Sequence, residues 1–194
     1  MTSISRSSIA LAKAVARDLL ADVHAVRTRT ALRVKHPTAV ISRRVTITGD
    51  PSRIKLGDRV SISGPTSIVV DDGGGLTGSR LEVGDETYIG EFGNIRTAGA
   101  PISIGARCLL AQNVTVVGSN HGTKAGVPIV DQDWSGTGVE IGDGVWIAAG
   151  CIIVPGARIG SGAVIGANSV VRGEVPENAI MVGSPARQVG ERKP

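Results

Sequence analysis

The 194-residue chain is rich in glycine, with 27 residues, and aromatic side chains make up only 2% of it. A core with one Phe and one Tyr must be narrow and lined by aliphatic side chains. The net charge of +4 is uneven: residues 1–36 hold seven Lys and Arg against two Asp, and the remainder is close to neutral. We therefore expect no nucleic-acid binding by the body of the protein.

Residues 1–36 are predicted to form a basic amphipathic helix and a linker, because apolar and basic residues alternate at helical spacing. The apolar stripe comprises Ile9, Ala12, Val15, Leu19, Val23 and Val26, and the opposite face carries Lys13, Arg17, His24 and Arg27. We expect this helix to cap the open end of the following domain. Weak contact with a membrane surface is the alternative. Charges interrupt the apolar stretch, so we expect no signal peptide and a cytoplasmic location.

A six-residue period organises residues 37–174. It is plainest in the series Ile141, Ile147, Ile153, Ile159, Ile165 and Val171, with a small or β-branched residue four positions after each of the first five. Upstream, the same register recurs in blocks of three: Leu56, Ile62 and Ile68; Val83, Ile89 and Ile95; Ile104, Leu110 and Val116. A period of six fits neither a helix nor a simple alternating strand, and it indicates short strands joined by tight corners.

Blocks of three predict coils of 18 residues with a triangular section, stacked into an all-β solenoid of about five to six coils. A generic β-sandwich would show strands of unequal length and looser spacing. The extra residues between blocks all enter at one corner, and the largest insertion is an excursion over residues 117–140. Chemistry on a regular scaffold is expected in such a loop.

The excursion carries His121, one of three histidines in the chain. It follows Asn120, which we expect at the last inward position of its coil. An imidazole titrates near neutral pH and suits general-base catalysis, although a lone histidine on a loop is often merely exposed. His24 and His36 are interpreted as solvated polar side chains.

The segment at residues 138–190, GVEIGDGVWIAAGCIIVPGARIGSGAVIGANSVVRGEVPENAIMVGSPARQVG, resembles the hexapeptide-repeat acyltransferases, among them the galactoside, maltose and colanic-acid O-acetyltransferases. SNHGTKAGVPI at 119–129 is similar to the "NHD" segment of members that acetylate bacterial surface polysaccharides. The resemblance covers roughly residues 40–190. It implies a left-handed parallel β-helix, a homotrimer with active sites between adjacent subunits, acetyl-CoA as the acyl donor, and no metal.

The resemblance also implies roles for single residues. His121 falls on the catalytic histidine. The acyl-CoA contacts fall on Trp146, the backbone N–H of Ala149, Ala167, Arg172, Pro185 and Arg187, with a tail at 175–194 closing that site. The acceptor side falls on Glu91, Phe92, Asn94 and Asn120. Gly122 stands where relatives often carry Asp, so what orients His121 is left open, as is the role of Trp134.

Together these features predict an acetyl-CoA-dependent O-acetyltransferase acting on a hydroxyl of a sugar, a surface-polysaccharide precursor or a related small molecule. N-acetylation of an amino sugar and a catalytically inactive structural solenoid are the alternatives. A zinc lyase built on this solenoid would need three histidines at an interface, and the solenoid has one. Cys108 and Cys151 take small inward positions, so we expect them to pack rather than react. The acceptor and the acyl-chain length stay open.

Overall fold

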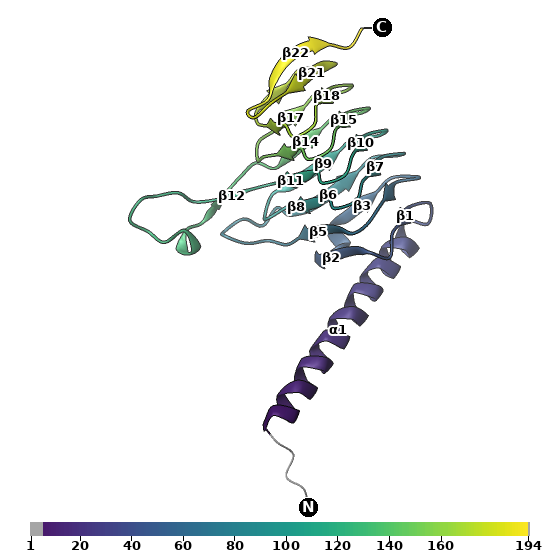
Figure 1. Cartoon of the computed structure of the whole chain (residues 1–194), viewed down its shortest axis with the longest axis vertical. Coiled ribbons are helices and arrows are strands. Elements are labelled where there is room, and N and C mark those ends of the chain that lie inside the picture. Colours follow the sequence, from purple (N-terminus) through teal and green to yellow (C-terminus); the bar gives the residue numbers. More distant parts are fainter. Residues whose placement is uncertain (1–5, 194) are drawn as a thin grey trace, which may run out of the picture.

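The structure, a computed structural model, describes residues 6–193 and joins a long helix to a triangular prism of short strands (Figure 1). The sides of the prism are three parallel sheets, called here faces A, B and C in the order in which each coil visits them. The solenoid predicted from the six-residue period is confirmed, as a left-handed parallel β-helix with a helix before it.

The strands are two to five residues long. Face A holds β1 (Val40–Ile41), β4 (Ser61–Ile62), β7 (Tyr88–Ile89), β10 (Leu109–Leu110), β15 (Trp146–Ile147), β18 (Val164–Ile165), β21 (Ala179–Val182) and the antiparallel β22 (Arg187–Glu191). Face B holds β2 (Val45–Gly49), β5 (Thr66–Val70), β8 (Asn94–Arg96), β11 (Thr115–Val117), β16 (Ile152–Ile153) and β19 (Val170–Val171). Face C holds β3 (Ile54–Leu56), β6 (Arg80–Val83), β9 (Pro101–Ile104), β14 (Val139–Ile141), β17 (Arg158–Ile159) and β20 (Glu174–Val175).

The core is a stack of aliphatic side chains from all three faces. Every anchor predicted between Leu56 and Val171 is buried, with at most 7% of its surface exposed. Parallel pairing sets the anchors of one face directly over one another, as in the pairs Leu110–Ile147 and Ile147–Ile165. Burying one such side chain contributes roughly 1.5–3 kcal/mol, so the repeat itself stabilises the prism.

The edges of the prism differ in regularity. At the edge between faces A and B (edge AB), the turns have one length, and four of them share one left-handed position, occupied by Phe92, Asn113, Gly150 and Asn168. The edge between faces B and C (edge BC) takes the insertions, as predicted. It bears the short helix η1 (Pro51–Arg53), a loop at 71–79 and the long excursion.

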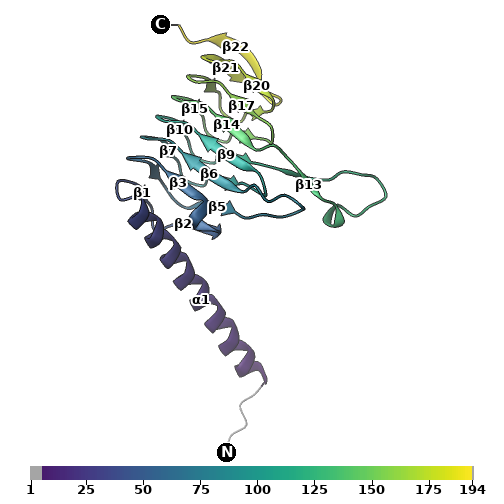
Figure 2. The same ribbon diagram turned by 180° about the vertical axis from the view of Figure 1, so that it is seen from behind.

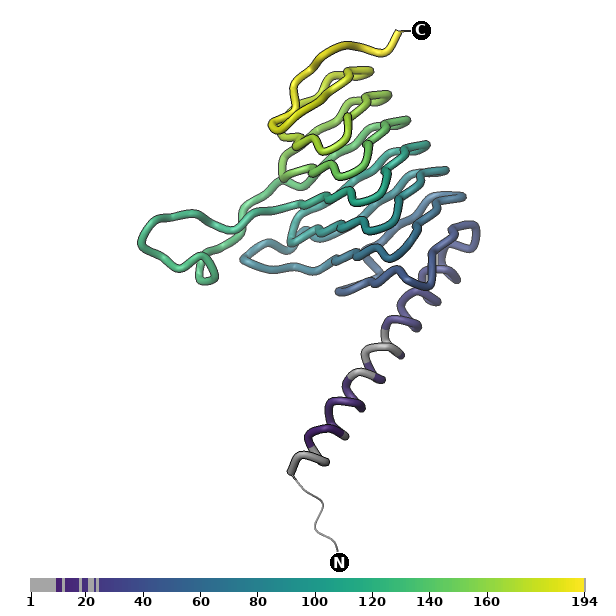
Figure 3. Tube along the Cα trace, viewed as in Figure 1, coloured from purple at the N-terminus to yellow at the C-terminus, as the bar shows by residue number. Residues whose placement is uncertain are grey.

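The excursion leaves edge BC after β11 and projects from the prism on the same side as the 71–79 loop (Figures 2 and 3). It contains the antiparallel strands β12 (Asn120–His121) and β13 (Trp134–Ser135), and the short helix η2 (Ile129–Asp131). The inward position expected for Asn120 is wrong, because its side chain is exposed. The chain turns outward at Gly118, and Ser119 is buried instead, where its hydroxyl donates to Ala98 O.

Helix α1 (Arg6–Lys35) begins far from the prism and meets it only with its last turns (Figure 1). Thr28 and Leu32 are buried there. The predicted apolar stripe does not cover the coil end: Val15, Leu19 and Val23 are each at least half exposed. A 30-residue helix is about 45 Å long, and the coil end is roughly 15–20 Å wide, so most of the helix overshoots it.

The side chains of Ile9, Ala12 and His24, which the sequence also placed on this helix, lie outside the part that the structure describes. No helix in the described part is long and apolar enough to cross a bilayer.

Basic side chains at the end of α1 cap the first coil. That coil has no predecessor to bond its strand carbonyls, which need other donors. Arg29 Nη1 donates to Val45 O of face B at 3.1 Å, and Lys35 Nζ to Ile54 O of face C at 3.2 Å. Arg33 donates to Ile41 O of face A. The helix end therefore supplies one cation to each face.

Candidate active site

His121 lies exposed on the excursion, opposite Trp134 in the β12–β13 pair. The two rings meet edge to face, with centroids 5.3 Å apart and an interplanar angle of 69°. Among the side chains and backbone groups that the structure describes, none forms a hydrogen bond with either nitrogen of the imidazole. The side chain is thus accessible to a ligand and in contact with a half-buried indole.

The excursion that carries His121 is tied together by the side chain of Gln132. Its Nε2 donates to Lys124 O at 3.1 Å and to Val127 O at 2.8 Å, and its Oε1 accepts from Lys124 N at 2.7 Å. Gly122 N donates to Asp133 O at 2.9 Å beside the catalytic candidate. These bonds close the tip of the loop, so the excursion is an ordered arm.

The residues expected to contact acyl-CoA lie mostly along edge AB. Ala149 and Ala167 occupy the same turn position in successive coils, about 4.8 Å apart. In the described part of the chain, neither backbone N–H has an acceptor, so both are free to bond a ligand. Trp146 is 49% exposed on face A at the start of the Ala149 turn.

The C-terminal hairpin extends this edge by one more level. Gly183 N donates to Ser169 Oγ at 3.0 Å and Ala186 N to Val170 O at 2.8 Å, which fixes the turn that carries the exposed Pro185. Arg187 is exposed at the start of β22. Edge AB is therefore a straight track with a cation at its C-terminal end, suited to an extended anionic ligand.

The residues predicted to bind the acceptor are divided between the two edges. Glu91 and Phe92 lie in the edge AB turn two coils below Ala149, and Asn94 follows them on face B. Phe92 is 60% exposed and has a φ of 58°, a left-handed conformation that is uncommon for a bulky residue. Asn120 instead accompanies His121.

Arg172 lies apart from the other residues predicted to contact acyl-CoA, because it follows β19 and lies at edge BC. Face B separates the two edges by about five residues of extended chain, or about 15 Å. Within one chain, His121 and the Ala149 turn therefore lie on opposite sides of a face.

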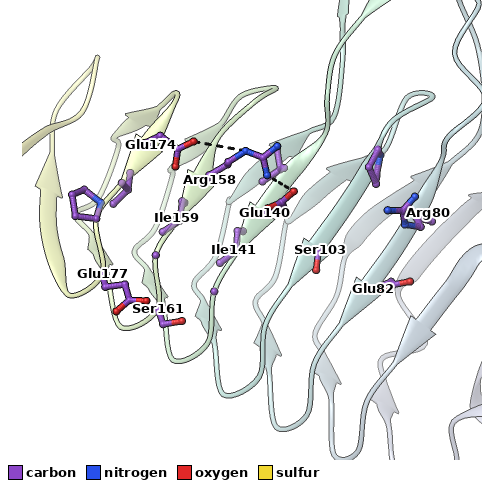
Figure 4. Close-up of a pocket in the computed structure, with 16 residues that line it drawn as sticks. Arg80, Glu82, Ser103, Glu140, Ile141, Arg158, Ile159, Ser161, Glu174 and Glu177 are labelled. Atoms are coloured by element: carbon purple, nitrogen blue, oxygen red, sulfur yellow. Dashed lines mark ion pairs between the residues drawn. The ribbon is translucent and has the colours of Figure 1, made fainter.

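A groove of about 770 Å³ lies on face C (Figure 4), and none of the predicted site residues lines it. Arg158 bridges Glu140 and Glu174 across neighbouring strands there, and this pairing raises the pKa of its guanidinium. The charged side chains lining the groove are Arg80, Glu82, Glu140, Arg158, Glu174 and Glu177. Four carboxylates against two guanidinium groups disfavour the phosphates of CoA, so we do not place the donor in this groove.

Both cysteines are buried in the core, and burial raises the pKa of each thiol. Cys108 Sγ lies 3.1 Å from Gly142 O, and Cys151 Sγ lies 3.1 Å from Gly166 O. Only a thiolate is a good nucleophile, so neither side chain is suited to accept an acyl group. Among the side chains that the structure describes, no three His, Cys, Asp or Glu residues are grouped as a metal site would require.

Two features of the structure escaped the sequence analysis. The first is the turn at Gly73–Gly75, which supports the indole of Trp134. Three consecutive glycines in an insertion were a signal that some group approaches the backbone closely. The second is His36, interpreted as solvated: its Nε2 is buried and has no hydrogen-bond partner within the described residues.

One segment of the chain matches a known family model. Residues 138–173 match the family described as bacterial transferase hexapeptide (six repeats). No curated protein matches this hexapeptide-repeat chain.

Solved hexapeptide-repeat structures share its fold. AntD, an N-acyltransferase from Bacillus cereus in complex with dTDP-4-amino-4,6-dideoxyglucose and coenzyme A, aligns with a TM-score of 0.70 and 21% identity over 81% of this chain and 82% of its own. The acetyltransferase VCA0836 from Vibrio cholerae aligns with a TM-score of 0.60 and 26% identity, over 73% and 75% of the two chains. Its complex with acetyl-CoA aligns with a TM-score of 0.59 and 22% identity, over 100% and 93%.

Proposed function

We propose that this protein is an acyl-CoA-dependent acyltransferase in which His121 is the general base. The observation that carries the proposal is an exposed imidazole on an ordered arm of a hexapeptide-repeat prism. The repeat signature and the resemblance to CoA-bound transferases support acyl transfer from a CoA thioester.

The chemistry needs no nucleophile from the protein. His121 takes the proton of the acceptor as the acceptor attacks the thioester carbonyl, and the tetrahedral intermediate then expels the CoA thiolate. The imidazolium returns the proton to that sulfur, so the base is regenerated. The free N–H of Ala149 is placed on edge AB, where it can bond the developing oxyanion.

The active assembly is proposed to be a homotrimer. His121 and edge AB lie on opposite sides of face B within one chain, so a complete site needs edge BC of one subunit against edge AB of its neighbour. Cyclic symmetry closes such a head-to-tail contact. Exposed apolar side chains on face A, among them Leu109 and Trp146, would be covered in this assembly. Light scattering should give roughly three times the 19.8 kDa chain mass.

The acceptor is proposed to be a hydroxyl of a sugar or of a surface-glycan precursor, and the acyl group to be acetyl. A hydroxyl gains most from a base, because it must lose its proton during attack. One comparison favours a second candidate: AntD is an N-acyltransferase whose complex holds an amino sugar nucleotide. An amino sugar is therefore the rival acceptor.

The deciding experiment incubates the purified protein with acetyl-CoA and paired acceptors that differ only in a hydroxyl or an amine. Released CoA thiol is measured first, and each product is then treated with alkaline hydroxylamine. An ester product is cleaved, which would support O-acetylation. An amide product resists cleavage, which would support N-acetylation instead. No thiol release with any acceptor or acyl-CoA would support an inactive solenoid.

A further inference from the structure

The indole of Trp134 lies between His121 and a turn made by the 71–79 loop. On one side it meets the imidazole edge to face. On the other side it rests on backbone: a Cβ at Gly73 would lie 2.6 Å from Trp134 Cη2, and a Cβ at Gly74 would overlap the ring. The backbone N–H of Trp134 donates to Gly74 O at 2.7 Å. A ring can lie this close only because both positions lack a side chain.

The turn beneath the indole is itself well supported. Leu76 N donates to Gly73 O at 2.9 Å, and Gly74 and Gly75 both have positive φ, the pattern of a type I′ turn. The buried hydroxyl of Ser79 ties the loop to the next coil, because its Oγ accepts from Gly99 N at 2.8 Å. The Gly73–Gly75 turn, called here the platform, is therefore held in a fixed position relative to the prism.

The loop gains a further tie from an ion pair. Arg53 Nη1 lies 2.6 Å from Asp72 Oδ2, and Asp72 Oδ1 accepts from Ser79 N at 3.1 Å. The guanidinium of Arg53 holds the pKa of Asp72 below its usual range, so the carboxylate stays ionised at neutral pH. Coil, loop, turn and indole thus form a continuous chain of contacts that ends at His121.

We propose that Trp134, seated on the Gly73–Gly75 turn, is the positioning residue that sets the orientation of His121. This inference rests on the proposed acyl transfer by that histidine. An exposed imidazole without a hydrogen bond would sample several rotamers, and the indole restricts them by packing. In some relatives a carboxylate directly after the histidine could orient it, but this chain has Gly122 at that position. Trp134 would orient His121 instead.

The kinetic test compares Trp134→Leu with Trp134→Phe. Because misplacing a base by about 1 Å can cost up to about 100-fold, Trp134→Leu should lower kcat by 10- to 100-fold and leave the KM for acetyl-CoA unchanged. Trp134→Phe keeps an aromatic ring and should stay within about threefold of wild type. In a His121→Ala background, Trp134→Leu should cause no further loss, because both changes act through the same group.

Trp134 as a wall of the acceptor site gives the opposite pattern. Trp134→Leu would then raise the acceptor KM at nearly constant kcat, and its effect would be undiminished in the His121→Ala background. Either result would overturn the positioning role.

The platform is tested by a matched pair of substitutions within one turn. Gly74→Ala should displace the indole, because its Cβ would overlap Trp134, and should reproduce the kcat loss of Trp134→Leu. Gly75→Ala is the control: its φ of +82° gives comparable or greater backbone strain, but its Cβ would lie 3.4 Å from Asp133 Oδ1 and away from the ring. Equal kcat losses in both variants would show that turn strain, rather than the indole, is responsible.

A readout independent of activity is the NMR signal of the His121 ring, identified by its loss in His121→Ala among the three histidines of the chain. The nearby indole should shift this signal by its ring current. Trp134→Leu and Gly74→Ala should abolish that shift, and Gly75→Ala should keep it. An unchanged signal in Trp134→Leu would overturn the inference whatever the activity. A lost shift in a protein whose wild type transfers no acyl group would refute the proposed function while leaving the contact intact.

Discussion

Edges AB and BC are built from the same repeat, yet one is uniform and the other is not. Edge AB sets the turns of Ala149 and Ala167 directly above one another, each with a free N–H, and so offers a straight track of backbone donors. The inserted residues at edge BC form the glycine turn and the arm that carries His121. The difference teaches that regularity suits binding of an extended ligand, and that an insertion suits placement of one reactive group.

The largest effect is expected on edge BC, from His121→Ala. Loss of a general base typically costs about 10²–10⁴-fold in turnover. The fold should persist, because the side chain lies outside the buried stack. The exposed Lys124 on the same arm supplies the control, and Lys124→Ala should leave turnover unchanged. Turnover of His121→Ala within threefold of wild type would remove this residue from the mechanism.

A smaller effect is expected on edge AB, from Ala167→Trp. This residue is exposed, so a large side chain fits without disturbing the core and should obstruct the track instead. We expect the KM for acetyl-CoA to rise on the order of tenfold or more, equivalent to at least about 1.4 kcal/mol of binding. Glu177→Trp, at the edge between faces C and A, is the matched control. Equal KM values in both variants would move the donor away from edge AB.

Nested truncations separate the two halves of α1. Removing residues 1–24 should leave thermal stability nearly unchanged, because Val15, Leu19 and Val23 contact little. Removing residues 1–36 takes away Leu32, whose burial is worth roughly 1.5–3 kcal/mol, and should lower the melting temperature by several degrees. If the full truncation is as stable as the whole chain and loses only its binding to anionic vesicles, the helix is a membrane-surface anchor.

The smallest effects are expected from the cysteines. Cys108→Ala or Cys151→Ala should cost on the order of 1 kcal/mol in the free energy of unfolding and should not change turnover per folded molecule. Because burial raises both thiol pKa values, a thiol reagent at neutral pH should modify unfolded protein much faster than native protein. A reagent that blocks native turnover, together with an inactive Cys→Ala variant, would indicate an acyl-cysteine route.

The fold was predictable because a six-residue period in blocks of three indicates a solenoid of three-stranded coils. Anchors such as Ile147 and Ile165 are buried as that solenoid requires. What escaped prediction depends on contacts that no period records. Asn120 was misplaced because the chain turns outward at Gly118, where the backbone of the preceding coil lies against it. The role of Trp134 required knowing that the arm folds back onto Gly73 and Gly74, some 60 positions earlier in the sequence.

Helix α1 also shows that a sequence pattern does not predict which residues make tertiary contacts. Its stripe was visible in the sequence, but helical periodicity does not say which turns meet the prism. Arg29, Arg33 and Lys35, which bond the carbonyls of the first coil, look in sequence like ordinary surface cations. The cytoplasmic location stays a prediction.

The most direct test of the two-edge account is subunit mixing. His121→Ala and Ala167→Trp each damage one edge and should be nearly inactive alone at limiting acetyl-CoA. If a site combines edge BC of one subunit with edge AB of the next, unfolding and refolding the two variants together should restore about a quarter of wild-type activity, because one random neighbour pair in four is intact on both sides. If both edges of one subunit formed the site, no mixed trimer would contain an intact site, and activity that stays at the level of the separate variants would contradict the account.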